Sequence, residues 1–120
     1  MGYYTKFDLA AYDAKTKQPI NKDLEAEIAR KIWLKMTGSD SYVPRDFEDA
    51  VSGDAMKWYD HEEDMYDISL EYPDVIFVLD GEGEDFPDAW RYFAHNGMSE
   101  TIYAEIHYPD PVNPMFDPYK

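Results

Sequence analysis

One stretch of this 120-residue chain constrains its folding more than any other, because it carries charge of a single sign. Between Lys57 and Arg91 lie twelve aspartate and glutamate residues and no lysine or arginine. Like charges at helical spacing repel by a few tenths of a kcal/mol per pair, and net self-repulsion works against the compact state. A chain that keeps such a density of charge is expected to use it. Residues 58–90, called the acidic window below, therefore predict a binding surface rather than a solubilising coat.

The charge and composition of the whole chain exclude several classes of function. A formal net charge of −15 argues against direct binding to nucleic acids or anionic membranes, which carry the same sign. Cysteine is absent, which excludes disulfides, thiolate metal sites and a cysteine nucleophile. No apolar run approaches the roughly 20 residues of a membrane span, and the first residues lack the features of a signal peptide. We expect a soluble cytoplasmic protein without a cofactor.

The hydrophobic pattern predicts alternating strands and helices. A first helix is expected between an N-cap at Asn21 and a stop at Gly38. A second helix is expected to begin with a capping box formed by Asp60 and Glu63 and to end before Pro73. Strands are predicted at 3–12, 55–59, 75–79, 89–95 and 99–108, and a short helical turn at 44–53.

The end of the chain indicates how the strands are connected. Asn96-Gly97 between two strand-like segments is the strongest short signal for a hairpin. Alternation in the strand that follows predicts Ile102 on the core face. The fold class predicted is α+β, one domain over 1–108 with two helices on one face of a four- or five-stranded antiparallel sheet, ferredoxin-like or related. Residues 109–120 hold four prolines and are predicted to form an extended C-terminal arm.

Most of the acidic window falls on the second helix and on the loop 80–88, where acids alternate with aromatic residues. Carboxylates about 5–6 Å apart on a helix approximate the spacing of phosphates along a nucleic acid strand. Acids with aromatic residues suit a groove evolved for phosphates and stacked bases. The predicted partner-binding residues are Glu62, Glu63, Asp64, Tyr66, Asp67, Glu71, Glu82, Glu84, Asp85, Phe86 and Asp88.

Two other classes of function remain open at this point. The first is a small metal-dependent ligand-binding protein or enzyme that uses Asp60, His61 and Asp64 with the 80–88 loop. That loop departs from an EF-hand, because its sixth position is Asp85 instead of glycine. Its acids would also repel a phosphate. The second alternative is a virion or assembly component that uses a sheet edge and the proline-rich tail.

Several motifs carry a resemblance to a known group of proteins. These are GYYT at 2–5, KWYDHEEDM at 57–65, SLEYPDVIFVLDGEGE at 69–84 and AWRYFAHNG at 89–97. Together they resemble a group of small acidic proteins of bacteriophages and prophages. Residues 14–54 do not contribute to the likeness. The resemblance implies a viral context and an early-type protein, many of which bind and disable host machinery.

The function expected from the sequence is therefore that of a non-enzymatic binding protein. Its partner would be a host protein with a basic surface. That surface would bind the acidic helix and loop in the way that it binds a nucleic acid. The chain would act as an inhibitor of a host defence or nucleic-acid-handling protein in the host cytoplasm, with no metal and no cofactor.

Overall fold

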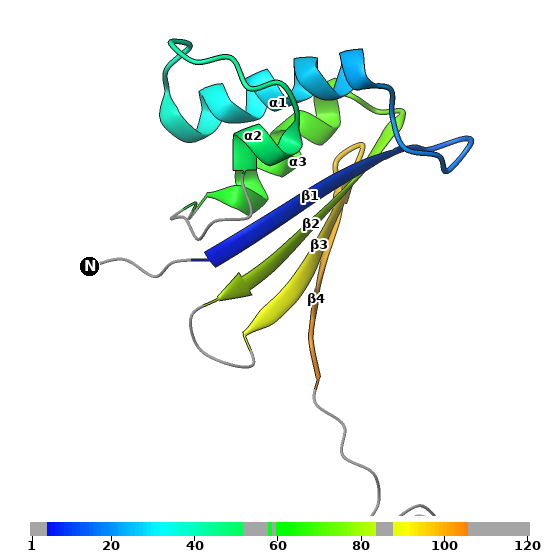
Figure 1. Ribbon diagram of the computed structural model, residues 1–120. Helices are drawn as coiled ribbons and strands as arrows, with labels where there is room; N and C mark the ends of the chain where they lie inside the picture. The colour runs from blue at the N-terminus through cyan, green and yellow to red at the C-terminus, as the bar shows by residue number, and fades with distance from the viewer. Residues whose placement is uncertain (1–4, 52–57, 59, 84–87, 106–120) are drawn as a thin grey trace, which may run out of the picture.

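The computed structural model describes residues 5–51, 58, 60–83 and 88–105 and has an α+β fold, as the sequence predicts. All elements lie in one layered unit, with the helices stacked above the sheet (Figure 1). The elements in chain order are strand β1 (Thr5–Asp13), helices α1 (Lys22–Thr37), α2 (Phe47–Val51) and α3 (His61–Glu71), and strands β2 (Val75–Gly83), β3 (Ala89–His95) and β4 (Met98–Tyr103).

The four strands form one antiparallel sheet in the order β1-β2-β3-β4. This order corrects the ferredoxin-like arrangement favoured by the sequence, in which strands are interleaved. All three described helices lie between β1 and β2 in the chain, and the shortest of them, α2, falls within the short helical turn predicted at 44–53. The remaining strands follow one another directly, so each pairs with its predecessor. The strand predicted at 55–59 lies outside the described residues except for Trp58, which is not in a strand.

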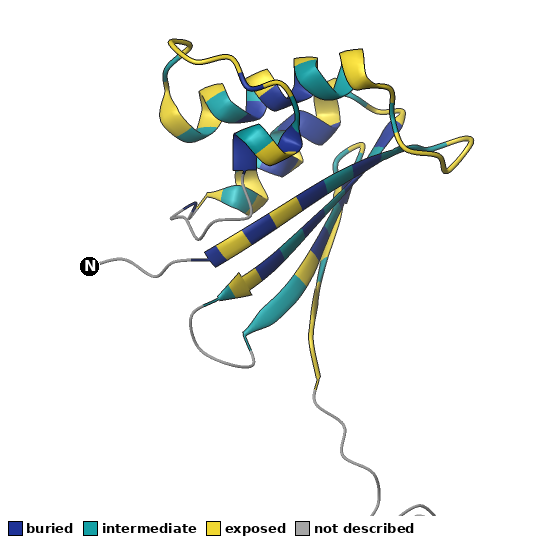
Figure 2. Cartoon of the chain, in the orientation of Figure 1, coloured by how far each residue is buried: buried dark blue, intermediate teal, exposed yellow. Residues whose placement is uncertain are grey.

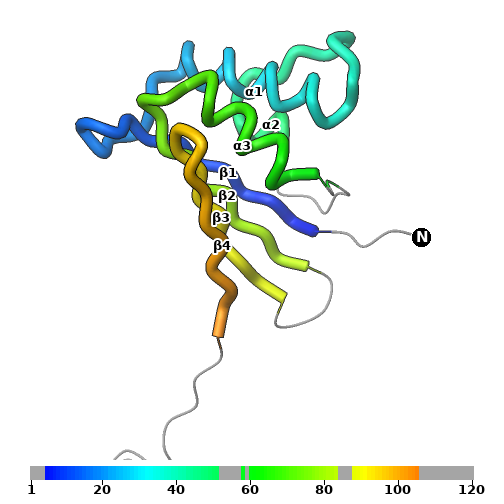
Figure 3. Tube along the Cα trace, turned by 180° about the vertical axis from the view of Figure 1, so that it is seen from behind, coloured from blue at the N-terminus to red at the C-terminus, as the bar shows by residue number. Residues whose placement is uncertain are grey.

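The helices cover one face of the sheet and leave the other face open (Figures 1 and 3). Burial alternates along β1 and β2, which is the pattern of strands with only one covered face (Figure 2). The core forms where α2 packs on β1 and α3 packs on β2 and β3, and α1 adds its buried side chains against α2 and α3. None of the described helices is long and apolar enough to span a membrane. The largest fully buried side chains include Ile28, Ile32, Met65, Ile68, Phe77 and Leu79.

Helix α1 begins and ends where the sequence predicts. The Asn21 side chain accepts a hydrogen bond from the Leu24 amide at 2.8 Å, which satisfies one of the free amides of the first turn. Gly38 has φ 70°, the left-handed conformation that glycine adopts without a steric penalty, and its amide donates to the Leu34 carbonyl at 2.7 Å. Both predictions are confirmed.

We expect Asn21→Ala to lower the free energy of unfolding by about 1 kcal/mol, because the Leu24 amide loses its acceptor. Asn21→Asp is the matched control, since aspartate caps a helix as well as asparagine does. Urea denaturation of the three proteins measures the effect. Equal losses for the alanine and aspartate variants would show that the side-chain hydrogen bond contributes nothing.

Helix α3 begins differently from the prediction. The Asp60 side chain makes no capping hydrogen bond, and only its backbone carbonyl accepts, from the Asp64 amide at 2.9 Å. The reason is conformational: Asp60 has φ −94° and ψ 24°, outside the extended region that a capping side chain needs. The prediction of a capping box formed by Asp60 and Glu63 is therefore wrong, although the predicted start of the helix is right.

The predicted hairpin joins β3 to β4 through Asn96 and Gly97, whose φ angles of 46° and 79° give a type I′ turn. The orientation predicted for β4 is wrong. Ile102 pairs with Arg91 and lies on the open face, whereas Thr101 pairs with the buried Tyr92 on the helix side. The apolar alternation misled here because β4 is an edge strand, and most of its side chains are exposed on both faces.

Candidate functional site

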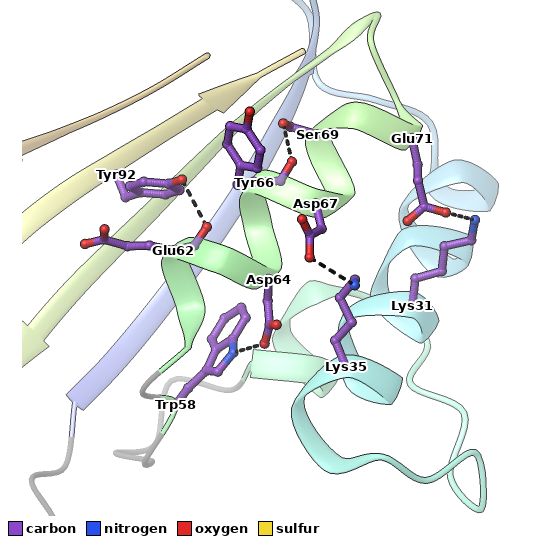
Figure 4. A network of polar contacts seen from close by, with 10 residues as sticks. All are labelled: Lys31, Lys35, Trp58, Glu62, Asp64, Tyr66, Asp67, Ser69, Glu71 and Tyr92. Carbon is purple, nitrogen blue, oxygen red and sulfur yellow. Dashed lines mark hydrogen bonds and ion pairs between the residues drawn. The ribbon is translucent and has the colours of Figure 1, made fainter. Parts of the chain in front are cut away.

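Helix α3 carries half of the described acids of the acidic window, and its buried side determines where they point. Met65 and Ile68 are fully buried and pack α3 onto the core of the sheet. Residues on the remaining sides of the helix face either the neighbouring helix α1 or solvent. The acids therefore divide into two sets with different surroundings (Figure 4).

The first set has polar partners within the protein, and two of its members lie beside the neighbouring helix α1. Asp67 forms an ion pair with Lys35 at 3.6 Å, and Glu71 forms one with Lys31 at 3.1 Å. The hydrogen bond to Glu71 also raises the pKa of Lys31 above its usual range. These contacts join α3 to α1, and pairs exposed to this degree contribute about 0–1 kcal/mol each. Both acids were predicted to bind a partner, but they contact α1 instead.

Asp64 belongs to the same set. Its carboxylate accepts a hydrogen bond from the indole nitrogen of Trp58 at 2.8 Å, and Trp58 is itself buried. An indole nitrogen that is buried needs an acceptor, so Asp64 stabilises the packing of Trp58 under the start of α3. Asp64, predicted to bind a partner, therefore has a structural role within the fold.

The second set lies along the outer side of α3, where Glu62, Glu63, Tyr66 and Leu70 form a row called the α3 strip below. Glu62 and Glu63 are exposed, and neither pairs with a lysine or arginine of the described residues. Tyr66 retains 39% and Leu70 51% of its accessible surface. Glu62 also lies 3.9 Å from Nε2 of His61. The α3 strip thus combines two exposed carboxylates, neither paired with a described lysine or arginine, with exposed apolar side chains.

Hydrogen bonds from the sheet and the hairpin hold the α3 strip in place. The Tyr92 hydroxyl donates to the Glu62 carbonyl at 3.1 Å, and the Ser69 hydroxyl donates to the Tyr66 carbonyl at 2.7 Å. The amide of Gly97 donates to the Ser69 hydroxyl at 3.1 Å. Burial raises the pKa of Tyr92, so its hydroxyl stays protonated as the donor over a wide pH range. The surface is pre-formed, which lowers the entropic cost of binding.

The loop half of the predicted site is described only at its ends. Glu82 is exposed near the end of β2 and faces Lys6 across the strand pair, while the Asp88 carbonyl accepts from the Gly83 amide at 2.7 Å. His61 stacks on Trp90, which places the start of α3 over the start of β3 and at the same end of the domain as this loop. Glu84, Asp85 and Phe86 lie outside the described residues.

The alternative site around His61 is not assembled in the structure. The His61 ring stacks on Trp90 with a centroid separation of 4.6 Å and an interplanar angle of 15°, and its Nδ1 lies 3.0 Å from the Trp58 carbonyl. His61 is therefore part of an aromatic cluster. Asp64 points to Trp58, and Asp60 is exposed. Among the described residues no three histidine, aspartate or glutamate side chains are placed to hold a metal ion.

Comparison with known proteins adds no information on the α3 strip: no family model, curated protein or solved structure matches this chain. The amino-acid sequence did contain a signal that Asp67 and Glu71 pair with α1. Lys31 and Lys35 are four residues apart on α1, as Asp67 and Glu71 are on α3. Matching spacings of opposite charge indicate helices that pair through those faces.

Proposed function

We propose that this chain is a non-enzymatic binding protein whose α3 strip docks on a basic surface of another protein. The observation that carries the proposal is the division of the α3 acids. Asp64, Asp67 and Glu71 have partners within the fold, whereas neither Glu62 nor Glu63 pairs with a lysine or arginine among the described residues, and Glu62 has only a 3.9 Å contact with Nε2 of His61. Carboxylates without an internal cation are available to lysine or arginine from outside.

The apolar members of the α3 strip supply what charge alone does not. Exposed Tyr66 and Leu70 lie beside Glu62 and Glu63, so a partner would bury an aromatic anchor within an acidic rim. Tyrosine and arginine are the residue types that dominate binding energy at interfaces, and rim charges mainly set specificity and association rate. This combination suits a basic groove better than it suits a purely electrostatic contact.

A basic groove of this kind is typical of proteins that bind nucleic acids, so the chain would compete with nucleic acid for it. Together with the likeness to small acidic bacteriophage proteins, this supports an inhibitor of a host defence protein or nucleic-acid-binding enzyme. The mechanism is competition: the carboxylates form ion pairs with arginine and lysine side chains that otherwise contact phosphates. The proposed site of action is the host cytoplasm, and no metal or cofactor is needed.

The test is affinity capture from a bacterial lysate with the wild-type protein and with Glu62→Gln/Glu63→Gln/Tyr66→Ala. We expect a retained protein that DNA displaces and that the triple variant fails to capture. Its retention should weaken steeply between about 50 and 500 mM salt, because screening acts on exposed charges. Asp67 and Glu71 are left unchanged because they support the fold.

A matched control removes the same groups elsewhere. Asp40, Tyr42 and Glu48 are also two exposed acids and an exposed tyrosine, but they lie in the loop between α1 and α2 and on α2. Asp40→Asn/Tyr42→Ala/Glu48→Gln should capture the partner as the wild type does. Equal loss in both variants would mean that net charge alone drives capture. Retention indifferent to salt and DNA would contradict the competition mechanism.

A further inference from the structure

The outer edge of β4 has backbone groups that pair with no other described residue. The Ala104 amide donates to the Ala89 carbonyl at 2.8 Å, which fixes which residues of this strand face β3. In an antiparallel pair these residues alternate, so Ser99, Thr101 and Tyr103 direct their amides and carbonyls away from β3. None of the described residues pairs with that side of β4. Three donors and three acceptors therefore point outward in the register of a strand.

The other edge of the sheet, β1, is covered at the end that contains Ala11 and Tyr12. Beyond β1, Pro19 forms a bridge with Tyr12, and the Ile20 amide donates to the Ala11 carbonyl at 3.2 Å. Natural sheets blunt exposed edges with such coverage or with lysine, proline or bulges. Strand β4 contains neither lysine nor proline, and its register with β3 runs without a bulge. An edge of this kind can accept another strand.

The side chains of β4 indicate what that strand must contain. On the open face, Met98 and Ile102 keep 74% and 51% of their accessible surface, with Glu100 exposed between them. On the helix side, Tyr103 keeps 65%. The Glu62 side chain extends from α3 over this side of the sheet (Figure 4). A fifth strand would thus meet apolar groups together with carboxylates on both faces.

We propose that β4 receives an extended basic segment of the partner protein as a fifth strand. Its main-chain groups would bond to Ser99, Thr101 and Tyr103, and its aliphatic residues would cover Met98 and Ile102. Its lysine or arginine residues would pair with Glu62 and Glu100. The strand addition stands on the edge geometry, and the basic character of the segment rests on the function proposed for the α3 strip.

Charge selects this occupant over a second copy of the chain. Each copy carries a formal net charge of −15, and pairing two β4 edges would bring Glu100 and the α3 strip of one copy toward those of the other. Like charges brought together in this way oppose association. A basic strand from another protein meets the same carboxylates with the opposite sign.

The test uses a defined probe, the peptide Lys-Val-Lys-Val-Lys-Val-Lys, and nitrogen-15 NMR of the whole chain. We expect amide shifts concentrated on β4 and α3. Thr101→Pro removes an outward amide without removing a hydrogen bond to β3, so it should weaken peptide binding about tenfold or more. Thr101→Val, which keeps that amide, should bind as the wild type does. Glu62→Gln/Glu63→Gln should weaken peptide binding. It should also make binding depend less steeply on salt concentration, because fewer ion pairs form.

A second measurement leaves the protein unchanged, in case Thr101→Pro does not fold. Peptides N-methylated at alternate residues lose donors on one edge only, so one of the two methylated sets should fail to bind and the other should bind. Equal binding of both sets, or of wild type and Thr101→Pro, would overturn strand addition and leave the α3 strip proposal standing. Unchanged binding by Glu62→Gln/Glu63→Gln would overturn the basic partner while strand addition stands. A wild-type dimer in sedimentation that Thr101→Pro abolishes would make a second copy the occupant and overturn the proposal.

Discussion

Replacing Phe77 with alanine is expected to lower the free energy of unfolding by about 3–5 kcal/mol. Phe77 is buried near the start of β2, and its cross-strand neighbours are Ala11 on β1 and Ala94 on β3. These alanines have no side chain that can move into the space left by the ring. The cavity therefore cannot collapse, and the cost should fall in the upper part of that range. Urea denaturation measures this loss, with the same dependence of unfolding free energy on urea concentration used for wild type and variant.

Val78→Ala is the control for that prediction. Val78 is the next residue of β2, but it points to the open face and is half-buried. Removing its methyl groups should cost less than half as much, because water already reaches the site. Equal losses at the two positions would mean that the open face is as well covered as the helix side, which contradicts the layering of the fold.

Gly81→Ala should lower the free energy of unfolding by about 1–3 kcal/mol, although it adds only one methyl group. A Cβ at this position would overlap the indole ring of Trp90, the neighbour of Gly81 across the strand pair. The indole has little freedom to move, because it stacks on His61 and contacts the Phe7 ring edge-on at 5.9 Å. The clash therefore reaches the start of α3. Thermal or urea unfolding followed by circular dichroism provides the measurement.

A double-mutant cycle identifies the cause of the Gly81 effect. In a Trp90→Leu background the smaller side chain leaves room for a methyl group, so Gly81→Ala should cost much less there. An undiminished cost would assign the loss to the backbone conformation of Gly81 and not to the indole.

The parts of the fold that the sequence predicted correctly depend on neighbours in the chain. The Asn21 cap, the Gly38 stop and the Asn96-Gly97 turn are each decided within a few residues. The order of the strands depends on packing between distant segments, so the ferredoxin-like topology was not excluded by any local pattern. The same limit explains Ile102: alternation gives two faces of a strand but not which one the helices cover.

In the candidate site, too, local features were predicted and contacts between distant segments were not. The exposed position of Glu62 and Glu63 follows from their spacing on one helix, and it was predicted. The acidic window contains no base, so its acids looked uncompensated as a set. Lys35 and Lys31 come from α1 and neutralise Asp67 and Glu71 across more than thirty residues of chain. A charge balance taken along the sequence misses such pairs, because ion pairs form between neighbours in space.

The placement of all three described helices between β1 and β2 has a consequence for the order of folding. Strands β2, β3 and β4 follow each other directly, so their pairing closes only short loops. The ladder between β1 and β2 joins Asp13 to Val75 and must close the whole helical segment, at a larger entropic cost. We expect the three-stranded meander to form first and β1 to join it late. The strand that leaves the ribosome first would then be the last to find its place in the sheet.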